Sequence, residues 1–257
     1  MPFDGVSRIK RARSEREALA SASSLVPIGN RNSKMPGPVF SVATHACGVG
    51  GDLAKIEGSV CHGCYAARLE KFRENVAASW DRNLELFMSA IDGGAAAREA
   101  WIAAAVLGIR EGARLRDAYM RWFDAGDLPH GKSPSGEARG PVALAMICEV
   151  SRRTPEIAHW LPTREAKAVR AYLATGARIP ANLALRLSAP MIDQRPVTLT
   201  AAEREAGILT STVHRKPSEA RARAAGEVCE ADTRGQKCGP CRACWDRGTA
   251  NVSYRYH

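Results

Sequence analysis

Apolar side chains recur along this chain in two patterns, helical stripes and short runs. Between residues 66 and 91 they step by three or four positions, which predicts one long amphipathic helix ending at Asp92-Gly93-Gly94. Three further helices are predicted over residues 95–111, 142–152 and 165–174. Short apolar runs predict strands over residues 39–43, 119–123, 157–161, 182–187 and 207–214. Strands that alternate with helices indicate an α/β fold with a largely parallel sheet or barrel.

The chain divides into three segments. Residues 1–34 are polar and basic without a sustained apolar face, so we expect a basic N-terminal arm with a short helix over residues 13–20. Residues 35–214 hold the alternating elements and form the predicted metal-binding α/β domain. Residues 215–257 form a cysteine-rich segment that we expect to pack against the same domain. A chain of 257 residues is long enough to bury a substantial core.

Polar residues follow several predicted strands directly. In parallel α/β folds, ligands bind beyond the carboxyl ends of the strands. We therefore expect one rim to gather the candidate catalytic residues, which are Asp124, Asp127, Arg164, Ser188 and His214. For the two aspartates a purely structural role as turn formers or helix caps is an equal alternative.

Composition restricts the classes of protein considered. A hydrophobic content of 45% and a charged content of 25% are typical of soluble globular proteins. No apolar run approaches the roughly 18 residues that span a bilayer, and no secretion signal is seen. We therefore expect a cytoplasmic protein without a membrane partner. The net charge of +10 suits nucleic acid, although the basic residues form no single patch and a solvated basic surface is the alternative. The oligomeric state stays open.

Seven of the eight cysteines fall into two groups. The first cysteine group is Cys47, Cys61 and Cys64, and the second cysteine group is Cys229, Cys238, Cys241 and Cys244. Thiols stay reduced in the cytoplasm, so clustered cysteines favour metal binding over disulfides. Three cysteines at successive x2 spacings are typical of iron–sulfur sites, whereas a single zinc more often takes two separated pairs. We therefore predict iron–sulfur clusters of the 4Fe-4S type, with zinc as the alternative.

The two groups predict different chemistry. A four-iron cluster held by three thiolates leaves one iron open to a ligand, which is the arrangement that radical S-adenosylmethionine enzymes use. The first spacing here is x13 rather than the x3 of those enzymes, which weakens the prediction of S-adenosylmethionine binding without weakening that of a metal. Four cysteines in the second group make a complete ligand set, so a closed structural or electron-transferring site is expected.

The chain resembles the phage-encoded family known as gene product 88. The matching segments begin with Asn-Ser-Lys-Met-Pro-Gly-Pro and end with the last cysteines, at residues 32–41, 64–66, 124–127, 160–164, 185–190, 210–214 and 238–245. A looser similarity extends to phage proteins with a Cys-x2-Cys-Tyr-Ala motif on a barrel like that of radical S-adenosylmethionine enzymes. The resemblance implies an incomplete parallel (β/α) barrel, a C-terminal cysteine knuckle, a metal and a phage origin, hence the host cytoplasm.

Three function classes follow. An iron–sulfur enzyme, radical S-adenosylmethionine-like or redox, would use the first cysteine group as an open reactive site. A nucleic-acid-binding or host-takeover protein would use clusters or zinc only to hold its fold together. A redox sensor is the third class. The sequence favours a cluster protein of enzyme-like architecture and specifies no reaction.

Overall fold

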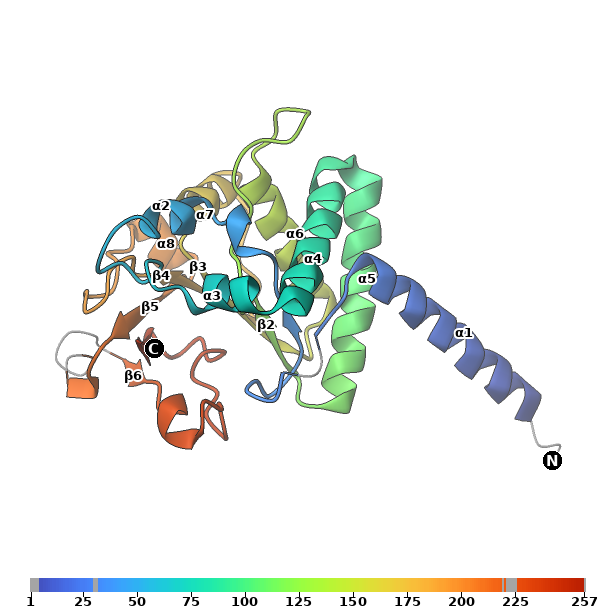
Figure 1. The fold of residues 1–257 in the computed structure, drawn as a ribbon. Helices are drawn as coiled ribbons and strands as arrows, with labels where there is room; N and C mark the ends of the chain where they lie inside the picture. The colour runs from blue at the N-terminus through green and yellow to red at the C-terminus, as the bar shows by residue number, and fades with distance from the viewer. Residues whose placement is uncertain (1–4, 30–31, 219, 221–225, 257) are drawn as a thin grey trace.

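A computed structural model describes residues 5–29, 32–218, 220 and 226–256 (Figure 1). The described chain forms one seven-stranded sheet in which every pairing is parallel, in the order β1-β2-β3-β4-β5-β7-β6. The strands are β1 (Val39–Phe40), β2 (Tyr119–Trp122), β3 (Ala158–Thr163), β4 (Leu183–Ser188), β5 (Leu209–His214), β6 (Glu227–Val228) and β7 (Asn251–Arg255). The α/β prediction with a parallel sheet is confirmed.

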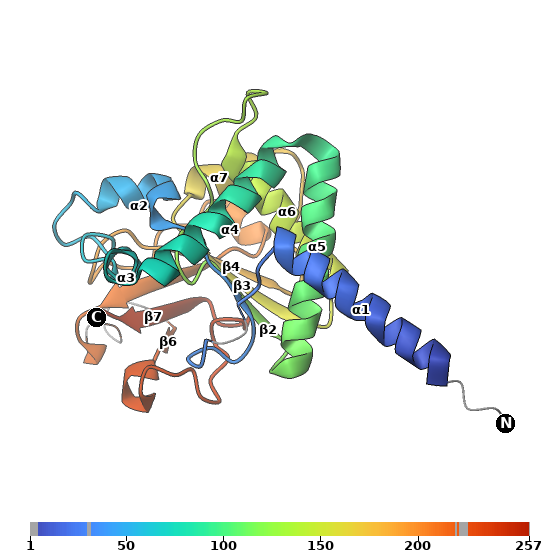
Figure 2. The ribbon, with the colours of Figure 1, turned by 45° about the vertical axis from the view of Figure 1, so that its right-hand side comes forward.

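Helices connect successive strands. They are α1 (Gly5–Leu25), α2 (Gly48–Leu53), α3 (Tyr65–Phe72), α4 (Glu74–Asp92), α5 (Gly94–Leu115), α6 (Arg139–Arg153), α7 (Ala166–Ala174) and α8 (Ala201–Glu205). Because β1 to β5 lie side by side in chain order, right-handed crossovers carry the connecting helices to one face of the sheet. Figure 2 shows α4, α5 and α6 over that face, with α1 projecting from the body. In the described part of the chain, no helix is both long and apolar enough to cross a membrane.

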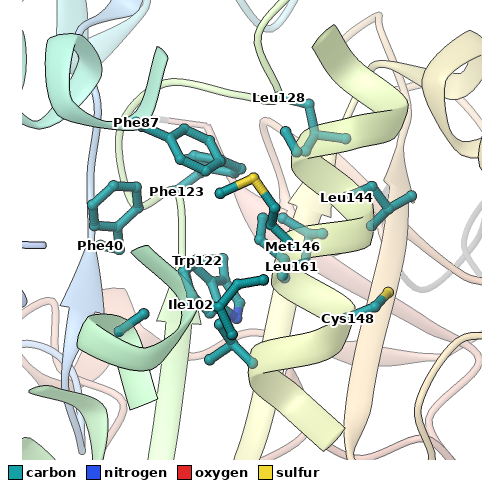
Figure 3. Packing of buried hydrophobic residues seen from close by; sticks show 14 of the residues in the cluster. Phe40, Phe87, Ile102, Trp122, Phe123, Leu128, Leu144, Met146, Cys148 and Leu161 are labelled. Carbon is teal, nitrogen blue, oxygen red and sulfur yellow. The ribbon is translucent and has the colours of Figure 1, made fainter. Parts of the chain in front are cut away.

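The main core lies between the sheet and these helices (Figure 3). Phe40 of β1 sits at its centre, with ring centroids 5.7 Å from both Phe87 and Trp101 and edge-to-face geometry in each pair. On β2, Met120 and Trp122 point into this core and are fully buried. Alternation along the strand sends Arg121 to the opposite face of the sheet.

A second apolar cluster lies on that opposite face. Trp160 of β3 packs there with Trp245 and Val252, together with three cysteines of the second group. The ring centroids of Trp160 and Trp245 are 5.2 Å apart, and the Trp245 indole N–H donates to the Met120 carbonyl at 2.8 Å. The cysteine-rich segment therefore covers the face of the sheet that the helices leave open.

Among the described strands, β1 and β6 each pair with one neighbouring strand only, so the sheet is open, which is compatible with the expected incomplete barrel but does not show one. Several elements depart from the sequence predictions. The predicted helix over residues 66–91 is interrupted at Arg73, where φ is −137° and ψ is 86°, and becomes α3 and α4. The N-terminal helix is longer than predicted, with Ala22 buried at its end and Val26 just beyond it. Residues 1–4 and 30–31 of the basic arm lie outside the described residues.

Candidate metal centre

The loop that holds the first cysteine group lies across the carboxyl ends of the strands. The backbone of Cys47 forms an isolated antiparallel β-bridge with Pro129, which follows β2. Ser59 forms a second one with Met191, which follows β4. The backbone N–H of Val60 donates to the Pro190 carbonyl at 2.9 Å. These contacts place the loop on the rim where the sequence predicts a binding site.

Two sulfur atoms of the first cysteine group converge beside Gly50. A Cβ atom at Gly50 would lie 3.6 Å from Cys61 Sγ and 3.7 Å from Cys47 Sγ. Burial raises the pKa of the Cys47 thiol, and so does negative charge on Asp127. The neighbouring thiols Cys64 and Cys61 add to the same rise. The three thiols therefore interact electrostatically, and a metal that bound them would have to displace their protons.

Asp127 and Arg164 lie beside this group. Asp127 accepts hydrogen bonds from Thr163 Oγ1 at 2.6 Å and from the Arg164 backbone N–H at 2.9 Å, which join the loops after β2 and β3. Burial raises the pKa of Asp127 to about 6, although these hydrogen bonds oppose the rise. Burial raises the pKa of Cys61 as it does that of Cys47, and the Arg164 charge partly opposes both rises. Arg164 is therefore placed to balance negative charge on the first cysteine group.

Asp124 is linked to the first cysteine group indirectly, through Tyr65, which follows Cys64. Its carboxylate accepts hydrogen bonds from Ser41 Oγ at 2.5 Å and Asn32 Nδ2 at 2.8 Å, so it fixes the segment that leads into β1. Its backbone carbonyl accepts a hydrogen bond from the hydroxyl of Tyr65, the residue after Cys64. The hydroxyl end of Tyr65 is buried while 48% of the residue stays exposed, and this burial raises the pKa of Tyr65 to about 12, so the hydroxyl stays protonated at neutral pH.

The remaining two rim candidates have other partners. Ser188 Oγ lies 2.9 Å from Ser211 Oγ on the adjacent strand β5. His214 is buried, and its Nδ1 lies 2.5 Å from Ser253 Oγ on β7. The structure thus brings Asp127 and Arg164 to the first cysteine group, and pairs Ser188 and His214 with serines of neighbouring strands.

Sequence reasoning missed Glu165. Its Oε1 accepts a hydrogen bond from the Val49 backbone N–H at 2.7 Å and would lie 3.0 Å from a Cβ atom on Gly48. A carboxylate at the first turn of a helix is favourable because unpaired N–H groups point toward it. Glu165 thereby holds α2, and with it Gly50, against the end of β3.

The second cysteine group lies against the second apolar cluster. Cys244 is buried, and its Sγ lies 3.5 Å from the Tyr254 hydroxyl. Burial raises the pKa of Cys244 to about 12 and also raises the pKa of Cys229 and Cys238. Cys241 is exposed. One edge of this group therefore faces solvent while the opposite edge packs on the sheet.

Backbone hydrogen bonds set the positions of these cysteines. The N–H of Cys229 donates to the Ser253 carbonyl at 2.8 Å, and that of Cys238 donates to the Lys34 carbonyl at 3.0 Å. Gly235 and Gly239 adopt positive φ angles of 64° and 55°, which glycine accepts without a Cβ penalty. Tight turns therefore fold residues 229–245, which we term the knuckle. Backbone hydrogen bonds anchor it to β7 and to Lys34 in the segment that precedes β1.

Arg186 of β4 anchors the same segment from beneath. This fully buried guanidinium donates five hydrogen bonds to backbone carbonyls. Four of them go to the knuckle and the turn after it, at distances of 2.8 to 3.1 Å, and their acceptors are Ala243, Cys244, Asp246 and Thr249. The polar backbone of the knuckle can therefore lie on an otherwise apolar sheet.

Arg121 lies between the two cysteine groups. Its guanidinium stacks on the Trp160 ring at 4.4 Å from the centroid. Burial raises the pKa of Tyr65, which is next to Cys64, and those of Cys238 and Cys244, and the Arg121 charge partly opposes each rise. One cation therefore acts on the second cysteine group and on the residue that follows Cys64.

Four buried side-chain N–H groups near the cysteines have no hydrogen-bond partner among the described residues. Each belongs to a residue that contacts a cysteine group or shifts the pKa of one of its thiols. The four donors are the Nε atoms of Arg121, Arg164 and Arg234 and the Nε1 atom of Trp160. Buried donors in folded proteins are almost always satisfied, so these four are compatible with an acceptor that the polypeptide does not supply. Trp101 Nε1 in the main core also lacks a partner within the described part of the chain, so the set does not by itself require such an acceptor.

Comparison with protein families adds one result. The family model described as gene product 88 matches residues 14–247, which is most of the chain and includes both cysteine groups. No curated protein and no solved structure matches it. The predicted family is therefore confirmed, and the chain belongs to the gene product 88 family.

Proposed function

We propose that this protein binds two iron–sulfur clusters, an open reactive one at the first cysteine group and a closed one at the second. The observation that supports this most strongly is the set of buried N–H donors around both groups. Cluster sulfurs are acceptors for such donors, and these hydrogen bonds tune cluster potential. Arg121, Arg164 and Arg234 would also offset the negative charge of thiolate-bound clusters.

The spacing of the cysteines along the sequence favours clusters over zinc, because three cysteines at successive x2 spacings are typical of iron–sulfur sites and a zinc more often takes two separated pairs. Within the described residues, no three His, Cys, Asp or Glu side chains are arranged to hold one metal ion, whichever metal is considered. In a cluster each cysteine binds a different iron, so the sulfurs need not meet at one point.

As an enzyme, the protein would use the rim around the first cysteine group. A cluster there would supply electrons or an open iron, and the chain's own residues would position the substrate. Arg164 would attract an anionic group of that substrate. Burial raises the pKa of Asp127 to about 6, which is close to neutral pH. Its carboxylate would therefore accept or donate a proton once its hydrogen bonds to Thr163 and Arg164 loosen. S-adenosylmethionine is the co-substrate to test first.

Anaerobic purification tests the proposal. The protein should contain iron and sulfide and show visible charge-transfer absorption that bleaches on reduction. Cys61→Ala should lose part of the iron, while Cys148→Ala, at a fully buried cysteine outside both groups, should keep all of it. Colourless protein that binds stoichiometric zinc and takes up no iron on anaerobic reconstitution would contradict the proposal.

Two assays then separate the function classes. Reductive cleavage of S-adenosylmethionine to deoxyadenosine would support the radical enzyme. Salt-dependent DNA binding that survives cluster loss would instead support a nucleic-acid-binding protein that uses its metals structurally.

A further inference from the structure

The surface beside the first cysteine group is unusually apolar for an exposed helix. Three side chains of α3 form what we term the α3 stripe, at spacings i, i+4 and i+7. Their exposed fractions are 48% for Tyr65, 36% for Leu69 and 73% for Phe72. Contiguous exposed apolar residues of this kind commonly mark an interaction site.

Cations border the stripe. Arg68, Lys71 and Arg73 are all exposed, and among the described residues none of them forms an ion pair with a carboxylate. Lys71 instead lies 5.8 Å from the centroid of the Phe72 ring. An apolar centre with unpaired cations at its rim is complementary to a partner with an apolar patch surrounded by carboxylates.

The stripe is continuous with the first cysteine group. Cys64 is the N-cap residue of α3, and its carbonyl accepts the Arg68 backbone N–H at 3.1 Å. The helix has eight residues, so it is about 12 Å long. A protein seated on the stripe would therefore lie within about two helical turns of Cys64.

We infer that the α3 stripe docks a small acidic electron-carrier protein that reduces the cluster at the first cysteine group. This inference rests on the proposed function, because it requires a cluster that accepts electrons. In the step, the reduced carrier loses one electron and the cluster gains one, and no bond is made or broken. Electron-transfer complexes have small interfaces, which suits a stripe of three side chains. Opposite charge would accelerate the encounter.

Stopped-flow reduction tests the inference. The anaerobic holoprotein is mixed with a reduced, acidic [2Fe–2S] ferredoxin or, separately, with dithionite, and the bleaching rate is recorded. We expect the double variant K71E/F72S to slow reduction by ferredoxin about tenfold at low salt and to leave reduction by dithionite unchanged. The matched control is R114E/L115S on α5, where Leu115 is 59% exposed, and it should keep the ferredoxin rate.

Three outcomes would overturn the inference. The first is equal ferredoxin rates in both double variants, and the second is an equal loss with dithionite, which would indicate a damaged cluster. The third is selective binding of a labelled single-stranded oligonucleotide by the stripe, abolished in K71E/F72S.

A second experiment that needs no cluster tests the docking surface separately from the proposed function. Zero-length cross-linking to oxidised ferredoxin should join Lys71 to the carrier in the wild-type chain, and the yield should fall in F72S, which keeps the lysine but removes the exposed ring. If the protein holds no reducible cluster, the proposed function fails and so does reduction, yet the cross-link still reports whether the stripe docks an acidic protein. No cross-link at Lys71 overturns the docking surface itself.

Discussion

Replacing Arg186 by methionine removes the guanidinium beneath the knuckle and keeps an unbranched side chain about as long as the arginine stem. The wild-type side chain is fully buried and donates five hydrogen bonds to carbonyls, four of them in residues 243–249. Each such bond contributes on the order of 1 kcal/mol net, and burying the charge offsets part of the sum. Burial indeed lowers the pKa of Arg186. We therefore expect Arg186→Met to lower the free energy of unfolding by about 3–5 kcal/mol.

Urea unfolding followed by circular dichroism measures this loss. Thiol labelling in native buffer provides the second readout, because the knuckle should detach first and expose Cys244, which is 8% exposed in the folded chain. Arg186→Lys should recover only part of the stability, since one ammonium cannot reach five carbonyls. Arg114→Met, at an exposed arginine, is the control and should change stability by less than about 0.5 kcal/mol. A loss below about 1 kcal/mol with unchanged labelling of Cys244 would refute the anchoring role.

Three more predictions follow from particular residues. Cys241→Ala should strongly reduce solubility or stability, whereas Cys64→Ala should give folded protein with less iron. Solubility and iron content measure the two effects, and the reverse result would mean that the structural and reactive sites are exchanged. Burial lowers the pKa of His159 to about 3, so below about pH 6.5 the unfolded chain binds a proton that the folded chain does not. The free energy of unfolding measured in urea should therefore fall by up to about 1.4 kcal/mol per pH unit as the pH drops from about 6.5 toward 3, and this slope should be absent in His159→Gln. Gly126→Ala places a Cβ 2.4 Å from Val42 Cγ2 at φ 81° and should cost more than Gly136→Ala, where φ is 87° and no atom lies within 4 Å; equal thermal shifts would contradict the clash.

Local pattern predicts most strands of this fold but misses what depends on distant neighbours. The runs that became β2 to β5 are apolar enough to identify, because parallel strands are buried on both faces. β7 escapes a search for short apolar runs because its sequence, Asn-Val-Ser-Tyr-Arg, has only two apolar residues and gains its burial from the knuckle, although its polar–apolar alternation is itself typical of a strand. The break at Arg73 is also invisible, since Leu69 and Phe72 continue the apolar period although they face solvent.

The same contrast holds for the candidate site. Asp127 and Arg164 could be placed on the rim because each follows a strand, and strand ends of a parallel sheet meet at one edge. Arg121 and Arg186 gave only a weak signal, a charged residue inside an apolar strand. Their partners are remote in the chain, with 58 positions between Arg186 and Cys244, so only the folded structure reveals what they stabilise.

The place of β7 in the sheet has a consequence for synthesis. β7 follows β6 in the chain yet lies between β5 and β6, so β6 has no strand partner and β5 has a bare edge until β7 has been translated. Val252 and Tyr254, which help to enclose the second cysteine group, also arrive late. Until β7 docks, the edge of β5 stays unpaired, and an unpaired strand edge can pair with another chain and aggregate. Nascent chains should therefore depend on chaperones until translation of β7 completes the sheet.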